Sequence, residues 1–110
     1  MRITIPVARV LAALLAQPET EHYGLDLMAT TDLPSGTLYP VLHRLRGAGW
    51  LAAEWEAVDP STVGRPARRY YRLTAEGVVE ARRALAELRA LAADQRPGLG
   101  GARPGEAPAW

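Results

Sequence analysis

The sequence predicts a mainly α-helical fold that carries one small β-hairpin and ends in a long helix. Apolar residues recur at helical spacing in four segments of the chain. Strict alternation of side chains, which is typical of strands, occurs only in two short runs, near residues 51–56 and 68–73. The last helical segment continues to about Asp94, a length of about 20 residues or about 30 Å.

Composition limits the classes of protein to consider. The chain has 110 residues, enough for one modest domain, and a net charge of only +1. Positive charge is local instead, because residues 60–75 contain four arginines and no acid. The absence of Cys excludes a disulfide scaffold, and the longest apolar run, residues 10–16, is far too short to span a membrane. We therefore expect a cytoplasmic protein with no membrane partner.

The first two helices are predicted on either side of Pro18. Thr4 is expected to cap the first helix, with Pro6 in the opening turn, where its missing N–H costs nothing. A second helix is predicted from about residue 20 to Thr31. Gly24 would lie inside it at a cost of about 1 kcal/mol relative to Ala. Close approach of a neighbouring backbone would explain that glycine.

The third helix is predicted to begin at an N-cap on Ser35 and to end near Gly47 and Gly49. Four aliphatic residues form one stripe along it: Leu38, Val41, Leu42 and Leu45. The remaining surface has no acid and carries candidates for contacts with DNA phosphates or bases: Ser35, Thr37, Tyr39, His43, Arg44 and Arg46. The alternative is an ordinary amphipathic helix whose arginines form weak exposed pairs with Asp26 or Asp32.

The two alternating runs, joined by residues 57–67, predict a hairpin. Arg65, Arg68 and Arg69 are its candidates for contacts with phosphate or a narrow minor groove. Arg65 is favoured because Gly64 and Pro66 place it in an exposed loop, whereas strand alternation turns Arg69 toward Tyr71. A solvated hairpin tip is the alternative. Helix, turn and basic helix followed by such a hairpin predict a winged helix-turn-helix fold, with the hairpin as the wing.

The last helix is predicted from a cap at Thr74 to Asp94. A narrow apolar seam, typical of coiled coils, runs along it and consists of Ala81, Leu85, Leu88 and Ala92. We expect this seam to form a homodimer; the alternative is a helix folded back on its own domain. The predicted organisation is a DNA-binding domain at 1–74, a dimerisation helix at 75–94 and a disordered tail at 95–110, which is rich in Gly, Pro and Ala.

No group of residues in the sequence suggests catalysis or metal binding. His22 and His43 are isolated, and neither paired acids nor a nucleophile beside a base can be found. We therefore expect no enzyme activity, no cofactor and no metal site. The aromatic residues Trp50, Trp55, Tyr23 and Tyr71 are interpreted as core or interface packing rather than as a ligand cage.

Several blocks together resemble the PadR family of bacterial winged-helix transcriptional regulators. They are YG in the second helix, GTLYPVLHRLRGAGWL, Trp55 and GRPARRYYRLTAEG, in this order over most of residues 7–85. The length and the single C-terminal helix look like the shorter class of the family. The resemblance implies that the third helix enters the major groove, with Thr37 and Tyr39 at the DNA, and that Arg65 lies in the DNA-binding wing.

The resemblance also implies a homodimer in which the last helix packs on the partner, including the partner's first helix, where Val10 and Leu14 lie. Such proteins are usually repressors released by a small aromatic or drug-like effector. Some members stack flat ligands on an aromatic residue of the last helix, but residues 75–94 contain no Trp, Tyr or Phe.

The predicted function is therefore that of a sequence-specific regulator, most simply a repressor, that binds double-stranded DNA at a pseudo-palindromic operator as a homodimer. A small-molecule effector is compatible with the sequence, and so is a regulator without one. The alternative from another class is a winged-helix module that binds an acidic protein partner. For the DNA-binding protein, replacing Arg65 with Ala is expected to reduce the salt dependence of binding by about one ion per subunit.

Overall fold

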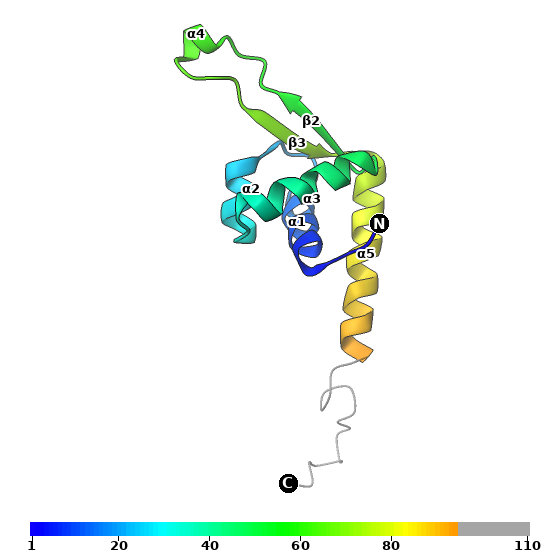
Figure 1. The fold of residues 1–110 in the computed structure, drawn as a ribbon. Coiled ribbons are helices and arrows are strands. Elements are labelled where there is room, and N and C mark those ends of the chain that lie inside the picture. The colour runs from blue at the N-terminus through cyan, green and yellow to red at the C-terminus, as the bar shows by residue number, and fades with distance from the viewer. Residues whose placement is uncertain (95–110) are drawn as a thin grey trace.

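The structure, a computed structural model, describes residues 1–94, so the predicted tail at 95–110 lies outside the described residues. Helices and short strands follow one another in the order α1 (Ile5–Ala16), β1 (His22–Tyr23), α2 (Gly24–Thr31), α3 (Ser35–Gly47), β2 (Leu51–Trp55), α4 (Pro60–Val63), β3 (Arg69–Leu73) and α5 (Ala75–Asp94). Figure 1 shows β2 and β3 projecting from the helical body as a wing, with α4 at its tip. The predicted fold class, a mainly α winged helix-turn-helix with a small β-hairpin, is confirmed.

Helix α1 lies at the centre of the helical body and contacts α2, α3 and α5. Thr4 caps α1 as predicted, since its hydroxyl accepts a hydrogen bond from the backbone N–H of Val7 at 3.4 Å. The predicted stripe of α3 is buried against α1, and none of its four aliphatic residues is more than 1% exposed. Burial of this stripe fixes the rotation of α3 about its axis, so the acid-free face points to solvent.

The sheet has three antiparallel strands in the order β1-β3-β2 rather than the two predicted. Strand β3 is central, pairing Tyr71 with His22 on one side and with Ala53 on the other. The predicted start of the second helix near residue 20 was therefore wrong, because His22 and Tyr23 are in β1 and α2 begins at Gly24. Two residues are too few to show the alternation of side chains that predicts a strand, so β1 could not be recognised in the sequence. The strand forms because it pairs with β3, which is far away along the chain.

Gly24 has a different role from the one predicted. It is the buried first residue of α2, and the neighbour that comes close is the side chain of Tyr39 rather than a backbone. A Cβ on Gly24 would lie 2.2 Å from the Tyr39 hydroxyl oxygen. The glycine therefore lets the Tyr39 ring of α3 lie directly on the start of α2.

Two other local predictions are corrected. Helix α3 has Pro34 as its N-cap, and Ser35 is the first helical residue, so Ser35 does not cap the helix. The loop predicted at 57–67 contains α4, a single turn in which Asp59 accepts a hydrogen bond from the backbone N–H of Ser61 at 3.0 Å. An Asp cap followed by proline is a helix-start signal, but the four residues of α4 are too few to show the helical spacing of apolar residues.

Helix α5 begins at the predicted cap, where the Thr74 hydroxyl accepts a hydrogen bond from the backbone N–H of Gly77 at 2.9 Å. Its first half packs on α1, and its second half continues past the helical body (Figure 1). The contact with α1 covers part of the predicted dimer surface. Val10, Leu14 and Ala81 are fully buried in the single chain, and Leu85 is 8% exposed.

The second half of α5 remains open. Leu88 is half-buried, Ala92 is exposed, and Leu91 beside them is 55% exposed. Within residues 1–94, no helix combines the length and the apolar character needed to cross a membrane.

Candidate nucleic-acid interface

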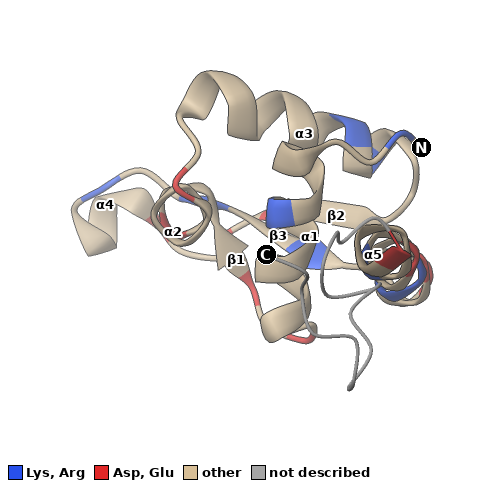
Figure 2. Cartoon of the chain, turned by 90° about the horizontal axis from the view of Figure 1, so that it is seen from below, with Lys and Arg blue, Asp and Glu red and all other residues tan. Residues whose placement is uncertain are grey.

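The outer face of α3 presents its polar and cationic side chains to solvent. Thr37 is half-buried, and the other five candidates on this helix are exposed: Ser35, Tyr39, His43, Arg44 and Arg46. No acid interrupts this face, as Figure 2 shows by the absence of acidic colour on α3. The proline inside the helix, Pro40, is exposed on the same face, so it leaves the buried stripe intact.

The first turn of α3 is open to an anion. Pro34 has no side-chain donor or acceptor, and no side chain within residues 1–94 caps the helix. Backbone N–H groups at a helix N-terminus point outward and carry partial positive charge, so they bind phosphate oxygens. Because Ser35 is not used as a cap, its hydroxyl is available beside these N–H groups.

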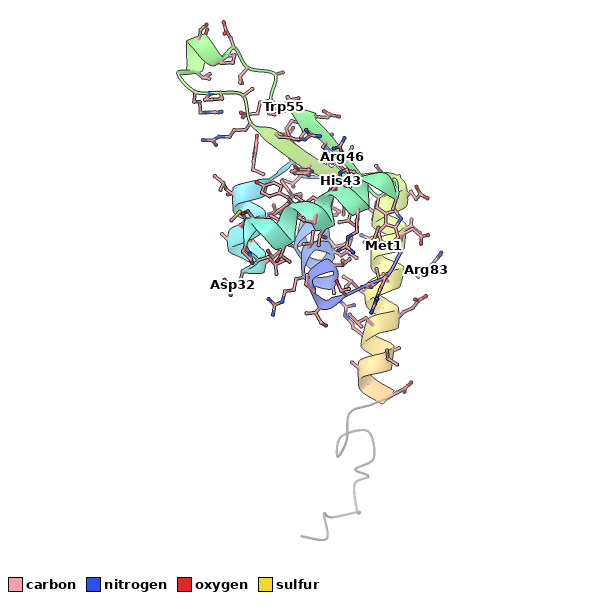
Figure 3. The ribbon with its side chains drawn as sticks, viewed as in Figure 1. Met1, Asp32, His43, Arg46, Trp55 and Arg83 are labelled. Atoms are coloured by element: carbon pink, nitrogen blue, oxygen red, sulfur yellow. The ribbon has the colours of Figure 1, made fainter. Side chains whose placement is uncertain are left out.

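At the other end of α3, His43 and Arg46 lie near the strands. They line one shallow depression of about 460 Å³ together with Gly47 and the first residues of β2. Figure 3 shows the two side chains close together on α3, with Trp55 farther out on the wing. The depression thus joins the cationic end of α3 to the base of the wing.

In the wing, Arg65 forms an ion pair with Glu56 that was not predicted from the sequence. Arg65 Nη1 donates to Glu56 Oε1 at 2.7 Å, and Nη2 donates to Oε2 at 3.3 Å. The hydrogen bond from Arg65, followed by one from the backbone N–H of Arg68, lowers the pKa of Glu56 to about 2, although partial burial opposes the shift. Glu56 is therefore ionised at neutral pH and neutralises the charge of Arg65.

The pair is also stable toward acid. Because the pKa of Glu56 is depressed in the folded chain, its contribution to stability is complete above the ordinary pKa of 4.5. That contribution is lost as the pH falls from there toward 2. Titration of this carboxyl therefore leaves the wing unchanged between neutral pH and mildly acidic pH.

The remaining arginines of the hairpin have different surroundings. The side chain of Arg68 is exposed, and within residues 1–94 it forms no ion pair. Arg69 is half-buried, and its guanidinium carbon lies 5.5 Å from the centre of the Trp55 ring, which is a cation–π distance. Arg72 is on the opposite face of β3 and pairs with Glu21 at 3.3 Å. Among these wing arginines, Arg68 is thus the one that is exposed and has no ion-pair partner within residues 1–94.

Among the aromatic residues, Trp50 and Tyr71 are buried as predicted, and Tyr23 is half-buried. Trp55 is 61% exposed, so of the two roles predicted for it, packing in the core is excluded and packing at an interface stays a prediction. It lies opposite Arg69 at the end of the β2–β3 ladder. The described residues contain no group of three His, Cys, Asp or Glu side chains that could hold a metal ion.

Comparison with known proteins identifies this arrangement. A sequence model described as the transcriptional regulator PadR-like family matches residues 10–83, which run from the middle of α1 through α2, α3 and the wing to the first half of α5. The chain belongs to this family. Its members are transcriptional regulators, and the predicted family and the prediction of a non-enzymatic regulator are confirmed.

Individual relatives agree with this assignment. Transcriptional regulator Rv3488 of Mycobacterium tuberculosis is 54% identical over 56 residues, a segment that covers 48% of this chain and 48% of that protein. The match therefore spans about half of this curated relative. Among solved structures, smu.1704 from Streptococcus mutans UA159 has a TM-score of 0.65 at 25% identity and covers 94% of this chain and 97% of its own.

A PadR family transcriptional regulator from Eggerthella lenta DSM 2243 has a TM-score of 0.61 at 29% identity, over 79% of this chain and 78% of its own. That protein is a member of the same family that the sequence model identifies. The likeness thus extends beyond the fold to the class of regulator.

The salt dependence of DNA binding tests whether Glu56 restrains Arg65. We expect Glu56→Gln to make the salt dependence steeper by about one ion per bound chain, because the released guanidinium then neutralises a phosphate. Glu54→Gln is the matched control, since it removes the same charge from β2 but its carboxylate binds Tyr70 rather than an arginine. Titrations of DNA affinity against salt measure both variants.

Adding Arg65→Ala to Glu56→Gln should abolish the increase, because the cation that produces it is then missing. Equal salt dependence in Glu56→Gln and Glu54→Gln would show that Arg65 is not restrained by its partner. Because of the Glu56 contact, we expect Arg65→Ala alone to have a smaller effect than the sequence suggests.

Proposed function

We propose that this PadR-like regulator binds double-stranded DNA as a homodimer at a pseudo-palindromic operator and acts there as a repressor in the cytoplasm. The observation that carries the proposal is the acid-free outer face of α3 with its uncapped N-terminus, beside a wing that exposes a cation. Both features favour the binding of phosphate groups, because each supplies positive charge without a competing carboxylate. The proposed contact residues are Ser35, Thr37, Tyr39, His43, Arg44, Arg46, Arg65, Arg68 and Arg69.

Roles within this surface follow from position and chemistry. The first turn of α3 and the wing arginines hold phosphates, which gives affinity without sequence preference. Thr37 and Tyr39 lie along the first two turns of α3, where a recognition helix approaches base edges. Their hydroxyl groups accept and donate hydrogen bonds, so they are suited to distinguish one base pair from another.

We expect Tyr39→Ala to weaken binding to the operator by at least about tenfold, which corresponds to the loss of one good base contact. Binding to unrelated DNA should change by less than about twofold, because phosphate contacts are retained. Gel-shift or anisotropy titrations with both DNAs measure the difference. Arg83→Ala is the control, since Arg83 is exposed on α5 (Figure 3) and its ion-pair partner within residues 1–94 is Glu80. Equal losses on both DNAs would contradict base recognition by Tyr39.

The dimer is supported by the open half of α5. An exposed leucine next to a half-buried one on a helix that extends past its domain is a surface that a second copy can cover. Two-fold symmetry would then present two α3 helices to half-sites about one helical turn, or a multiple of it, apart.

The decisive experiment is capture of genomic DNA fragments on the purified protein at physiological salt, followed by sequencing. Enrichment of a two-fold-symmetric site is the expected result, and its position relative to promoters would distinguish repression from activation. Uniform recovery that disappears with salt would leave only non-specific binding. In that case the second candidate function, a module for an acidic protein partner, would account better for the same cationic face.

A further inference from the structure

The two faces of the wing carry different residues. Ala53 pairs with Tyr71 across the β2–β3 ladder, and Trp55 pairs with Arg69. Residues that pair across a ladder, and residues two apart in one strand, lie on the same face of a sheet. These four residues therefore share one face of the wing, which we call the Trp55 face.

The acids of β2 and of the residue after it are on the opposite face. Glu54 and Glu56 flank Trp55 in the sequence, so alternation turns their side chains away from it. Glu54 accepts a hydrogen bond from the Tyr70 hydroxyl at 2.7 Å, and Glu56 binds Arg65. The Trp55 face thus carries a cation, Arg69, and none of these acids.

The Trp55 face meets α3 at a concave corner. Arg69 and Tyr71 line a cleft of about 330 Å³ there, together with Tyr39 of α3 and the first residues of α2. Tyr71 is buried, whereas Trp55 lies farther out on the wing (Figure 3). The exposed face of α3 therefore continues through this corner onto the Trp55 face.

The corner favours an anionic partner. Arg68 and Arg69 both line the cleft and form no ion pair within residues 1–94. Asp26 is the one acid among the residues that line it. Cations therefore outnumber acids where the wing meets α2 and α3, and the local potential is positive.

Trp55 adds a large apolar surface beside these cations. It is 61% exposed, although an indole ring gains much free energy from burial. The guanidinium carbon of Arg69 lies 5.5 Å from the ring centre, and Arg69 Nε is buried without a hydrogen-bond partner among the described residues. The ring, rather than a carboxylate, thus positions this guanidinium, which keeps its full charge.

The shape of DNA places one of its strands at this corner. A single sugar-phosphate backbone separates the major groove from the minor groove beside it. With α3 in the major groove and the wing at the neighbouring minor groove, this backbone has to cross the corner between them. Each of its nucleotides carries a charged phosphate and a largely apolar deoxyribose ring, which match a guanidinium and an indole placed side by side.

We propose that Trp55 is a DNA-contact residue, whose indole packs on deoxyribose rings of the backbone that crosses the corner while Arg69 binds an adjacent phosphate. The inference rests on the proposed function, because it requires α3 in the major groove. It adds an apolar contact that the arginines of the wing do not supply. Since every nucleotide has the same sugar, the contact strengthens binding to all DNA sequences alike.

Quenching of tryptophan fluorescence by acrylamide tests the contact without changing Trp55. Trp110 is first replaced by Phe, so that the emission comes from Trp50, which is 9% exposed, and from Trp55. Acrylamide should quench Trp55 in the free protein, and a saturating duplex of mixed sequence should remove most of this quenching. Adding Trp55→Phe to the same background should leave an emission whose quenching DNA does not change.

The outcomes of this measurement separate the two proposals. DNA binding with Trp55 as accessible as in the free protein would overturn the inference and leave the proposed function standing. A protein that binds no duplex DNA would overturn both. Protection of Trp55 by polyglutamate but not by DNA would assign the Trp55 face to an acidic protein partner and also overturn the inference.

Salt titrations distinguish a sugar contact by Trp55 from a role in positioning Arg69 alone. Trp55→Ala should weaken binding to the operator and to a mixed-sequence duplex by at least about tenfold, because apolar burial is lost. Its salt dependence should stay unchanged, whereas Arg69→Gln should reduce the salt dependence by about one ion per bound chain. Equal reductions in the two variants would show that Trp55 only holds Arg69, and would overturn the sugar contact.

Tyr70→Ala is the matched control for Trp55→Ala. Tyr70 is an aromatic residue of the same hairpin, but it lies on the opposite face, where its hydroxyl binds Glu54. The variant should change DNA affinity by less than about twofold, since it removes no DNA contact. Trp55→Phe should keep affinity within about threefold, because a flat ring remains. Equal losses in Trp55→Ala and Tyr70→Ala would show a general disturbance of the wing and overturn the contact.

Discussion

Gly77→Ala is expected to lower the free energy of unfolding by about 3 kcal/mol, a cost at the upper end of the usual range for overpacking. A Cβ at this position would lie 1.9 Å from the carbonyl oxygen of Trp50 and 2.7 Å from the carbonyl carbon. These are backbone atoms, so no side-chain rotation relieves the contact. The first turn of α5 and the segment before β2 would have to separate.

That separation is costly because the segment around Trp50 is held on both sides. The backbone N–H of Trp50 donates to the carbonyl of Leu45, and its own carbonyl accepts from Thr74, each at 3.0 Å. Moving α5 would also withdraw Ala81 and Leu85 from the core. The close approach at Gly77 therefore sets the direction of α5 after β3 and its packing on α1.

Thermal or denaturant unfolding measures this effect. For a domain of this size, a loss of about 3 kcal/mol lowers Tm by at least about 12 °C. Gly36→Ala is the matched control, because Gly36 is also in the first turn of a helix but has nothing within 4 Å of a new Cβ. That variant should be neutral or more stable by up to about 1 kcal/mol. Equal destabilisation of both variants would refute the steric explanation.

The helices were predictable because their signals are local. The stripe of α3, the cap at Thr4 and the cap at Thr74 each depend on residues within one or two turns. Hydrophobic spacing then placed the whole outer face of α3, since burying one face of a helix exposes the other. This part of the candidate site could therefore be predicted from the sequence.

The features that escaped prediction depend on residues far apart in the chain. Strand β1 exists because His22 and Tyr23 pair with β3. The contact between Glu56 and Arg65 requires the wing to close in one register, with the backbone N–H of Glu56 donating to the carbonyl of Arg68 at 2.8 Å. A sequence pattern shows that an arginine lies in a loop, but it does not show which carboxylate the fold brings beside it.

Leu88→Glu is expected to convert the proposed homodimer into monomers and to weaken operator binding by at least about 100-fold. Leu88 is half-buried on the part of α5 that extends past α1, next to Leu91, which is 55% exposed. A glutamate here would place a charge without a partner in the apolar contact between two α5 helices. The stability of a single chain should change little, because this half of α5 is not in its core.

The loss of DNA affinity follows from geometry rather than from any change at α3. When two subunits are joined, binding of one half-site holds the second recognition helix at a high effective concentration near the other half-site. A monomer keeps every proposed contact to its own half-site, including those of Tyr39 and Arg68, but loses this advantage. We therefore expect the variant to bind a single half-site and the whole operator with similar affinity.

Light scattering and titrations with whole and half operators measure the two effects. Ala90→Glu is the matched control, because it adds the same charge to an exposed position on the opposite face of α5. If both variants remain dimeric, the open half of α5 is not the interface. If Leu88→Glu is monomeric but binds the operator as tightly as the unchanged protein, recognition does not require two subunits, and the operator need not be palindromic.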